Sequence, residues 1–369
     1  MTPRRIAVWR LHSQHLAGWR PPDPAATVRS LLAVQAENPA QSAWAVATRT
    51  APSESGDPLR ESDIGRALDA GEFLRTHVLR PTWHYVHADD IRWLVELTAP
   101  AVRRLFQQQQ RTVGLDDATA HRAVDVVVEA LAEGHLTRPE LGERLAAHHL
   151  PAAGQALMLI VGLAEQEALV CSGVQRGQGP SAKQTYALLD ERAPNARRLG
   201  RDEALAELAL RYLTSHGPAT ERDLAYWATL SLTDVRAGIA AASSQLDSFE
   251  YEGRTLWFAA ADPALERSSP RAHLLQLLDE YYRGYQDSRA MLDAAGLLTP
   301  GREPAVGMLV VDGQVLGRMR RSVQPRQVRF DVEPLRPLTD DELAATEQAA
   351  ARYGAFLGRT PRLRFVDPT

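Results

Sequence analysis

A side-chain amide and a carboxylate lie two residues apart near the amino terminus of the chain. Gln35 and Glu37 flank Ala36 and are followed by the turn-forming pair Asn38 and Pro39. A carboxylate can act as a general base or stabilise positive charge, and an amide can hold a water through its donors and its acceptor. This pair is therefore a candidate for activating one water. The alternative is that Glu37 merely lies in solvent and Gln35 satisfies a loop carbonyl.

A helix is expected to position this pair. Asp23 is a good N-cap and Pro24 suits the first helical position, so a helix should begin there. The apolar residues that follow recur at helical spacing, and Gln35 takes the next position on the same face. The Asn-Pro step at 38–39 should end the helix, which leaves Glu37 in the last turn beside the negative end of the helix dipole.

Composition limits the class of protein. The chain has 369 residues, 44% hydrophobic and 24% charged, with a formal net charge of -4, so a nucleic-acid surface would have to be a local patch. Its single cysteine, Cys171, excludes an intrachain disulfide and a cysteine metal cluster, and the pair His148 and His149 has no third ligand at metal spacing. No signal-type segment and no apolar run of about 20 residues is present. We expect a cytoplasmic protein without a metal or cofactor.

A unit of helices followed by a hairpin recurs three times, at a spacing of roughly 80 residues. This pattern predicts tandem winged-helix modules, followed by a mostly β region. The expected boundaries are 1–110, 116–192, 200–260 and 262–369. Residues 74–86 alternate like the two strands of a hairpin, and Thr137 is expected to cap a helix in the second unit. In the third unit Thr220 and Thr233 are expected to cap helices over 221–229 and 234–242. In the last region we expect a helix or aromatic-rich connector over 271–289, strands over 305–311, 314–319 and 327–332, and a closing helix over 340–353.

Two further groups of side chains have the chemistry of DNA contacts. Arginines that follow the Asp312-Gly313 turn are expected to form a groove-facing finger, with a solvated charged edge as the alternative; they are Arg318, Arg320, Arg321 and Arg326. His84 lies between Trp83 and Tyr85 in a predicted wing strand. It could contact a phosphate, fix the catalytic loop by a hydrogen bond, or belong to the core.

The pair Asp279 and Glu280 suggests a second carboxylate site. Three tyrosines, Tyr281, Tyr282 and Tyr285, follow this pair directly. We interpret this segment as packing rather than catalysis.

Four segments together resemble the AlkZ/YcaQ family of winged-helix DNA glycosylases. They occur in the family's order and are Trp9-Arg10-Leu11, Leu32 to Glu37, Leu79 to Val86 and Leu278 to Tyr285. The resemblance implies an α+β protein in which three tandem winged helices surround a C-terminal β-barrel-like domain, with DNA in the concave face. The family's catalytic motif, Gln-x-Gln or Gln-x-Asp, is matched at Gln35 and, with a change, at Glu37. Arg80 and His84 join the arginines named above as expected DNA contacts.

The resemblance implies a monofunctional, metal-independent DNA glycosylase that acts as a monomer on duplex DNA carrying alkylated purines. An N7- or N3-alkylated purine is cationic and leaves as a neutral base, so catalysis must stabilise an oxocarbenium-like sugar and aim one water at C1′. Bulky natural-product adducts and interstrand cross-links are further expected substrates, in DNA repair or in self-resistance to an antibiotic.

Two alternatives remain open. The first is a winged-helix regulator without enzymatic activity, and the second is a protein that protects DNA by binding a genotoxin. Glu37 argues against the regulator, because a carboxylate directed at an anionic backbone weakens binding.

Overall fold

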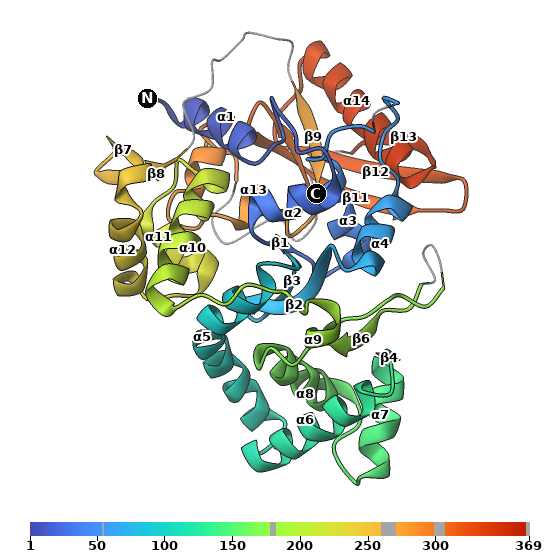
Figure 1. Ribbon diagram of the computed structural model, residues 1–369. Coiled ribbons are helices and arrows are strands. Elements are labelled where there is room, and N and C mark those ends of the chain that lie inside the picture. The colour runs from blue at the N-terminus through green and yellow to red at the C-terminus, as the bar shows by residue number, and fades with distance from the viewer. Residues whose placement is uncertain (54, 178–181, 260–270, 299–306, 367–369) are drawn as a thin grey trace.

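The computed structural model describes the chain except for residues 54, 178–181, 260–270, 299–306 and 367–369. Its described residues form an α+β fold with small antiparallel sheets in the first two thirds and one five-stranded sheet at the end (Figure 1). The start predicted for the last domain, residue 262, and the first two residues of the predicted strand 305–311 lie outside the described residues.

The first part of the chain combines five helices with a small sheet of order β1-β3-β2. The helices are α1 (Pro3–Ser13), α2 (Pro24–Leu31), α3 (Pro39–Ala47), α4 (Glu61–Ala70) and α5 (Ile91–Thr112). The strands are β1 (Val34–Gln35), β2 (Phe73–Leu79) and β3 (Thr82–His87). The N-cap predicted at Asp23 is confirmed, because its carboxylate accepts from the Ala26 N–H at 2.7 Å.

The second part has a buried core of its own and projects from the rest of the molecule, in green in Figure 1. Its helices are α6 (Asp117–Leu131), α7 (Arg138–Ala147), α8 (Gly154–Gln166) and α9 (Leu189–Arg192). Its sheet has the order β4-β6-β5, with β4 (Leu136–Thr137), β5 (Val170–Ser172) and β6 (Thr185–Leu188). The cap predicted at Thr137 is confirmed as a capping box with Glu140.

The third part has helices α10 (Arg201–His216), α11 (Glu221–Ala228) and α12 (Leu232–Ala241), a 3-10 turn η2 (Ser243–Gln245), and a hairpin of β7 (Asp247–Tyr251) and β8 (Arg254–Phe258). The cap predicted at Thr233 is wrong. Ser231 is the N-cap, and its hydroxyl accepts from the Asp234 N–H at 3.1 Å, so the helix begins two residues earlier. The assignment of the three parts as winged helices stays a prediction.

The last part is a curled sheet of order β13-β12-β11-β10-β9, packed against α14 (Asp340–Leu357). Its strands are β9 (Ala272–Leu275), β10 (Gly307–Val311), β11 (Gln314–Val323), β12 (Gln327–Pro334) and β13 (Thr360–Phe365), with the short turns α13 (Glu280–Arg283) and η3 (Arg289–Leu292) after β9. In the described residues the sheet remains open at β9 and β13 and is a half-barrel rather than a closed barrel.

The expectation of a helix or connector over 271–289 is corrected in its first part, where β9 forms. All four residues of β9 are buried, and a short buried strand has the same apolar pattern as a buried helix. The last part also packs closely on the first. The rings of Trp44 and Tyr353 stack with centroids 4.2 Å apart, and one buried cluster spans both parts.

Candidate active site

The helix that leads to Gln35 ends earlier than its sequence pattern predicts. Helix α2 stops at Leu31, because Leu32 adopts a left-handed backbone with φ of 67°. The prediction that Gln35 continues this helix is therefore wrong. The chain instead becomes extended, and Gln35 pairs with His84 across β1 and β3. Strand pairing and complete burial of Leu32 override the local helix preference here.

Gln35 and Glu37 differ sharply in exposure. Gln35 is 4% exposed, whereas Glu37 is an exposed residue. The backbone N–H of Gln35 donates to the Glu280 carboxylate at 3.0 Å, and the Gln35 amide oxygen accepts from the Arg80 guanidinium at 3.3 Å. The amide nitrogen is thus the part of Gln35 that can donate to a water, and Glu37 supplies the carboxylate that solvent reaches.

Glu280 is the acidic centre of the buried cluster around Gln35. Its side chain is 1% exposed and accepts from the Trp227 indole N–H at 2.8 Å. The guanidinium of Arg80 lies 3.7 Å from one carboxylate oxygen, and His216 Nε2 lies 3.6 Å from the other. Burial alone would raise the pKa of Glu280, but the interactions with His216 and Arg80 lower that pKa to about 2. Glu280 is therefore an anion at neutral pH.

Arg80 links the two strands of the hairpin to the third part of the chain. It lies in the turn between β2 and β3 with φ of 54°, and its backbone N–H donates to the Thr229 hydroxyl at 3.0 Å. Its guanidinium also donates to the Arg283 carbonyl at 3.1 Å. With 12% of its side chain exposed, Arg80 is mostly committed to these protein contacts.

His84 is fully buried behind Gln35, so it is placed to order the loop and not to reach a phosphate. Arg80 Nη2 lies 3.0 Å from His84 Nε2, and an arginine can only donate, so Nε2 accepts. The proton is then on Nδ1, which donates to the Thr82 carbonyl at 3.1 Å. Burial, followed by the Arg80 charge, lowers the pKa of His84 to about 3. We call Gln35, Arg80, His84, Trp227 and Glu280 the Gln35 network.

The residue between the two motif side chains is held at both of its backbone groups. Ala36 donates its N–H to the Trp83 carbonyl at 2.7 Å and accepts from Arg75 Nε at 2.8 Å. The Arg75 guanidinium lies over the Trp83 ring, 4.3 Å from its centroid. The Trp83 N–H in turn donates to the Glu37 carboxylate at 3.4 Å. Arg75 and Trp83 therefore fix the loop that carries Glu37.

The structure places two of the four arginines predicted after the Asp312-Gly313 turn, Arg318 and Arg320, on one face of β11, β12 and β13. Directly opposed residues share a face, as do residues two apart along a strand. The arginine face, as we name it, carries five arginines and two carboxylates; these are Arg318, Arg320, Arg329, Arg362 and Arg364 with Asp331 and Glu333. It is a local basic surface on a chain of net negative charge.

The other two predicted arginines lie apart from the arginine face. Arg321 points to the opposite side of β11, where it donates to the Tyr353 hydroxyl at 2.6 Å. Arg326 is exposed in the turn after β11. No interaction described for these arginines joins them to Gln35.

Sequence reasoning missed Glu280, Trp227 and Arg75. The acidic pair at 279–280 is conspicuous in the sequence, and its interpretation as packing holds for the tyrosines beside it. A carboxylate inside a run of large aromatic residues is expected to be buried, and a buried carboxylate needs a cation or several donors. That requirement is the signal that could have identified Glu280. Trp227 and Arg75 gave no local signal, because both act through contacts across the fold.

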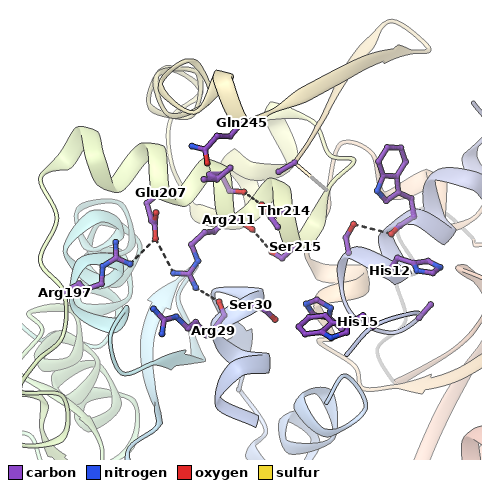
Figure 2. Close-up of a pocket in the computed structure, with 16 residues that line it drawn as sticks. His12, His15, Arg29, Ser30, Arg197, Glu207, Arg211, Thr214, Ser215 and Gln245 are labelled. Carbon is purple, nitrogen blue, oxygen red and sulfur yellow. Dashed lines mark hydrogen bonds and ion pairs between the residues drawn. The ribbon is translucent and has the colours of Figure 1, made fainter. Parts of the chain in front are cut away.

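The Gln35 network does not line the cavity of about 820 Å³ in this structure. A cavity of about 820 Å³ lies between α1, α2 and α10, and Figure 2 shows Arg29, Arg197 and Arg211 on one side of it and His12 and His15 on the other. The described residues that line it include no member of the Gln35 network. A second cavity, of about 540 Å³, is lined in part by residues 38–40, directly after Glu37.

Among the residues that the structure describes, no cluster of three or more histidine, cysteine or carboxylate side chains could hold a metal ion. No helix in the described parts of the chain is long and apolar enough to span a membrane.

Comparisons with known proteins show the fold and the family of this chain. The solved structure of the Streptomyces sahachiroi DNA glycosylase AlkZ resembles this chain with a TM-score of 0.75 and 20% identity, over 99% of this chain and 100% of that one. At that identity the likeness establishes a shared fold. No curated protein sequence matches at a significant level. The model of the AlkZ-like DNA glycosylase family matches residues 28–356, a range that contains Gln35, Glu37 and Glu280. The chain therefore belongs to the family of AlkZ-like DNA glycosylases.

Proposed function

We propose that this DNA glycosylase hydrolyses the N-glycosidic bond of positively charged N7- or N3-alkylated purines in duplex DNA. The observation that carries the proposal is the exposed Glu37 carboxylate, held beside Trp83 on a loop whose neighbour Gln35 is anchored in the buried network. Glu37 stabilises positive charge on the sugar or takes a proton from the attacking water. The amide nitrogen of Gln35 holds that water.

A cationic purine leaves as a neutral base and needs little help from an acid. The reaction therefore proceeds in this proposal with water as nucleophile and without a metal or cofactor. An enzyme that also cuts the strand would use an amine to form a Schiff base with the sugar. The one lysine of this chain, Lys183, pairs with Arg176 in the hairpin of the second part, which supports a monofunctional enzyme.

The arginine face supports duplex DNA as the ligand, because guanidinium groups bind phosphates in bidentate fashion. Arg326, exposed in the turn between β11 and β12, is a further phosphate contact in this proposal. Arg80 and His84 act in this proposal through Gln35 rather than at a phosphate. The cavity of about 540 Å³ that begins at Asn38 gives room for the substituent of a bulky adduct, which supports such adducts and cross-links as further substrates.

The test is release of base from a duplex that carries a single N7-methylguanine. Wild-type protein should free the methylated base and leave an abasic site, with strand scission only after alkali and with the same rate in EDTA. A panel of bulkier cationic adducts in the same duplex extends the test to the larger substrates. Tight DNA binding without base release from any of these duplexes would overturn the proposal in favour of a winged-helix regulator.

A further inference from the structure

The Gln35 network places a permanent cation beside the candidate centre. The Arg80 guanidinium lies 3.3 Å from the Gln35 amide oxygen and is 12% exposed. An arginine remains charged at every working pH, and partial burial reduces the screening of its charge by solvent. The substrate proposed above is itself cationic, and positive charge develops on its sugar during cleavage. An unbalanced Arg80 would therefore oppose the reaction that Gln35 serves.

Glu280 supplies the opposite charge at the same place. Its Oε1 accepts from the Gln35 N–H at 3.0 Å and lies 3.7 Å from Arg80 Nη2, so one oxygen contacts both the backbone of Gln35 and the cation that holds its amide. The two imidazoles that face this pair are neutral at pH 7, because burial lowers the pKa of both His84 and His216. The buried pair of Arg49 and Asp279, the residue before Glu280, is neutral as a whole.

We propose that Glu280 is a positioning residue that cancels the charge of Arg80 and so makes the centre selective for cationic lesions. Arg80 fixes the amide of Gln35 by hydrogen bonding, and Glu280 removes the electrostatic penalty of that arrangement. Because its carboxylate also accepts from the Gln35 N–H, Glu280 both balances the charge of Arg80 and holds the backbone of the motif in position. This inference rests on the glycosylase function proposed above.

A role in charge balance can be separated from a role in folding by changing both partners. Glu280→Gln keeps the size of the side chain and an acceptor for the Gln35 N–H but leaves Arg80 unbalanced. Adding Arg80→Gln removes the cation as well and returns the site to neutrality. A purely structural role predicts that the double variant is at least as damaged as the single one.

The experiment measures binding to two duplexes that differ in charge at one sugar. One carries a protonated pyrrolidine abasic analogue, which resembles the cationic sugar, and the other carries the neutral tetrahydrofuran analogue. The quantity compared is the ratio of the two dissociation constants for wild type, Glu280→Gln, and Glu280→Gln with Arg80→Gln. We expect Glu280→Gln to reduce the preference for the cationic duplex about tenfold, and the double variant to recover it to within about threefold of wild type.

An unchanged ratio of the two dissociation constants in Glu280→Gln overturns the inference. An equal loss of affinity for both duplexes also overturns it, if adding Arg80→Gln does not restore that affinity. If Glu280→Gln does not fold, the single variant Arg80→Gln tests the charge-balance role instead. Removing the cation should then preserve or raise the preference for the cationic duplex, and a lowered preference contradicts the charge-balance role. Wild-type protein that neither prefers the cationic duplex nor releases N7-methylguanine would instead refute the proposed function.

Discussion

The Gln35 network and the arginine face use charge in opposite ways. In the network the charges are buried or largely buried and shared among defined partners from different parts of the chain, as when Glu280 contacts Gln35, Trp227 and Arg80. On the arginine face four arginines are exposed, and arginines outnumber carboxylates; the exposed ones are Arg320, Arg329, Arg362 and Arg364. Buried charge fixes geometry and is costly to disturb, whereas exposed charge provides affinity that salt screens. We therefore propose that the Gln35 network determines the rate of base release and that the arginine face provides general affinity for DNA.

The largest difference between the regions should appear in stability. Arg49 and Asp279, directly beside the network, form a pair whose side chains are both 0% exposed. Asp279→Ala leaves a buried cation without its partner, which should lower the free energy of unfolding by about 3–5 kcal/mol. Arg329→Ala, which breaks an ion pair on the arginine face, should cost less than about 1 kcal/mol. Urea denaturation of the two variants measures both losses. Equal losses of unfolding free energy would contradict the difference proposed between the buried pair and the pair on the arginine face.

Acid should destabilise the fold through its buried histidines. The folded-state pKa of His84 is about 3 and that of His15 about 4, both below the ordinary value of 6.5, mainly because of burial. Below pH 6.5 these histidines become protonated in the unfolded chain but stay neutral in the folded chain. Their contribution to the free energy of unfolding is therefore fully present above pH 6.5 and falls as the pH drops toward 3. For His84 the loss by pH 4 is about 3 kcal/mol.

Unfolding measured from pH 7 to pH 4 in wild type and in two histidine variants checks this dependence. His84→Gln should flatten the pH dependence, whereas His121→Gln, which removes an exposed histidine, should leave it unchanged. An identical slope in all three proteins would show that His84 does not titrate as described.

A smaller effect is expected from loosening the motif loop. Arg75→Met removes the donor to the Ala36 carbonyl and the cation over Trp83, and we expect base release to slow about tenfold, or about 1.4 kcal/mol of barrier. Arg321→Met is the matched control, because Arg321 also lies over an aromatic ring but belongs to β11. Single-turnover rates at saturating enzyme measure both variants. An equal slowing in the control would mean that Arg75 has no special connection with the motif.

The smallest effects should come from the arginine face and should appear in binding alone. Arg320→Gln combined with Arg362→Gln should weaken duplex binding a few-fold and reduce the slope of log affinity against log salt by about 0.9 for each phosphate that the variant no longer neutralises. Titrations at several salt concentrations give the slope. The single-turnover rate should stay at the wild-type value, so a reduced rate would indicate that the two regions do not divide their tasks as described.

Local signals predicted much of the fold. The capping residues Asp23, Thr137 and Thr220 are where helices begin, because a capping side chain acts on the next three residues alone. The alternation of residues from Leu74 to Val86 likewise predicts the two strands of this hairpin. Strand β13 was missed even though Arg362, Leu363 and Arg364 alternate, and its pairing is parallel to β12 across the whole of α14.

The candidate site was harder to predict, because its geometry depends on distant contacts. Nothing beside Leu32 indicates a left-handed residue, and β1 exists because β3 lies about 50 residues further on to pair with it. Glu280 reaches Gln35 across 245 positions of the chain. The types of residue that do chemistry were evident in the motif at 35–37, whereas the buried charges that hold this motif required the folded arrangement.

The most direct test of the central claim is the single-turnover rate of N7-methylguanine release by Glu37→Gln, with Glu129→Gln, an exposed glutamate on α6, as control. We predict that Glu37→Gln slows release at least about tenfold, while its duplex binding is no weaker than that of wild type and its unfolding free energy stays at the values of wild type and of the control. A rate equal to that of wild type would contradict the assignment of Glu37 as the reactive carboxylate.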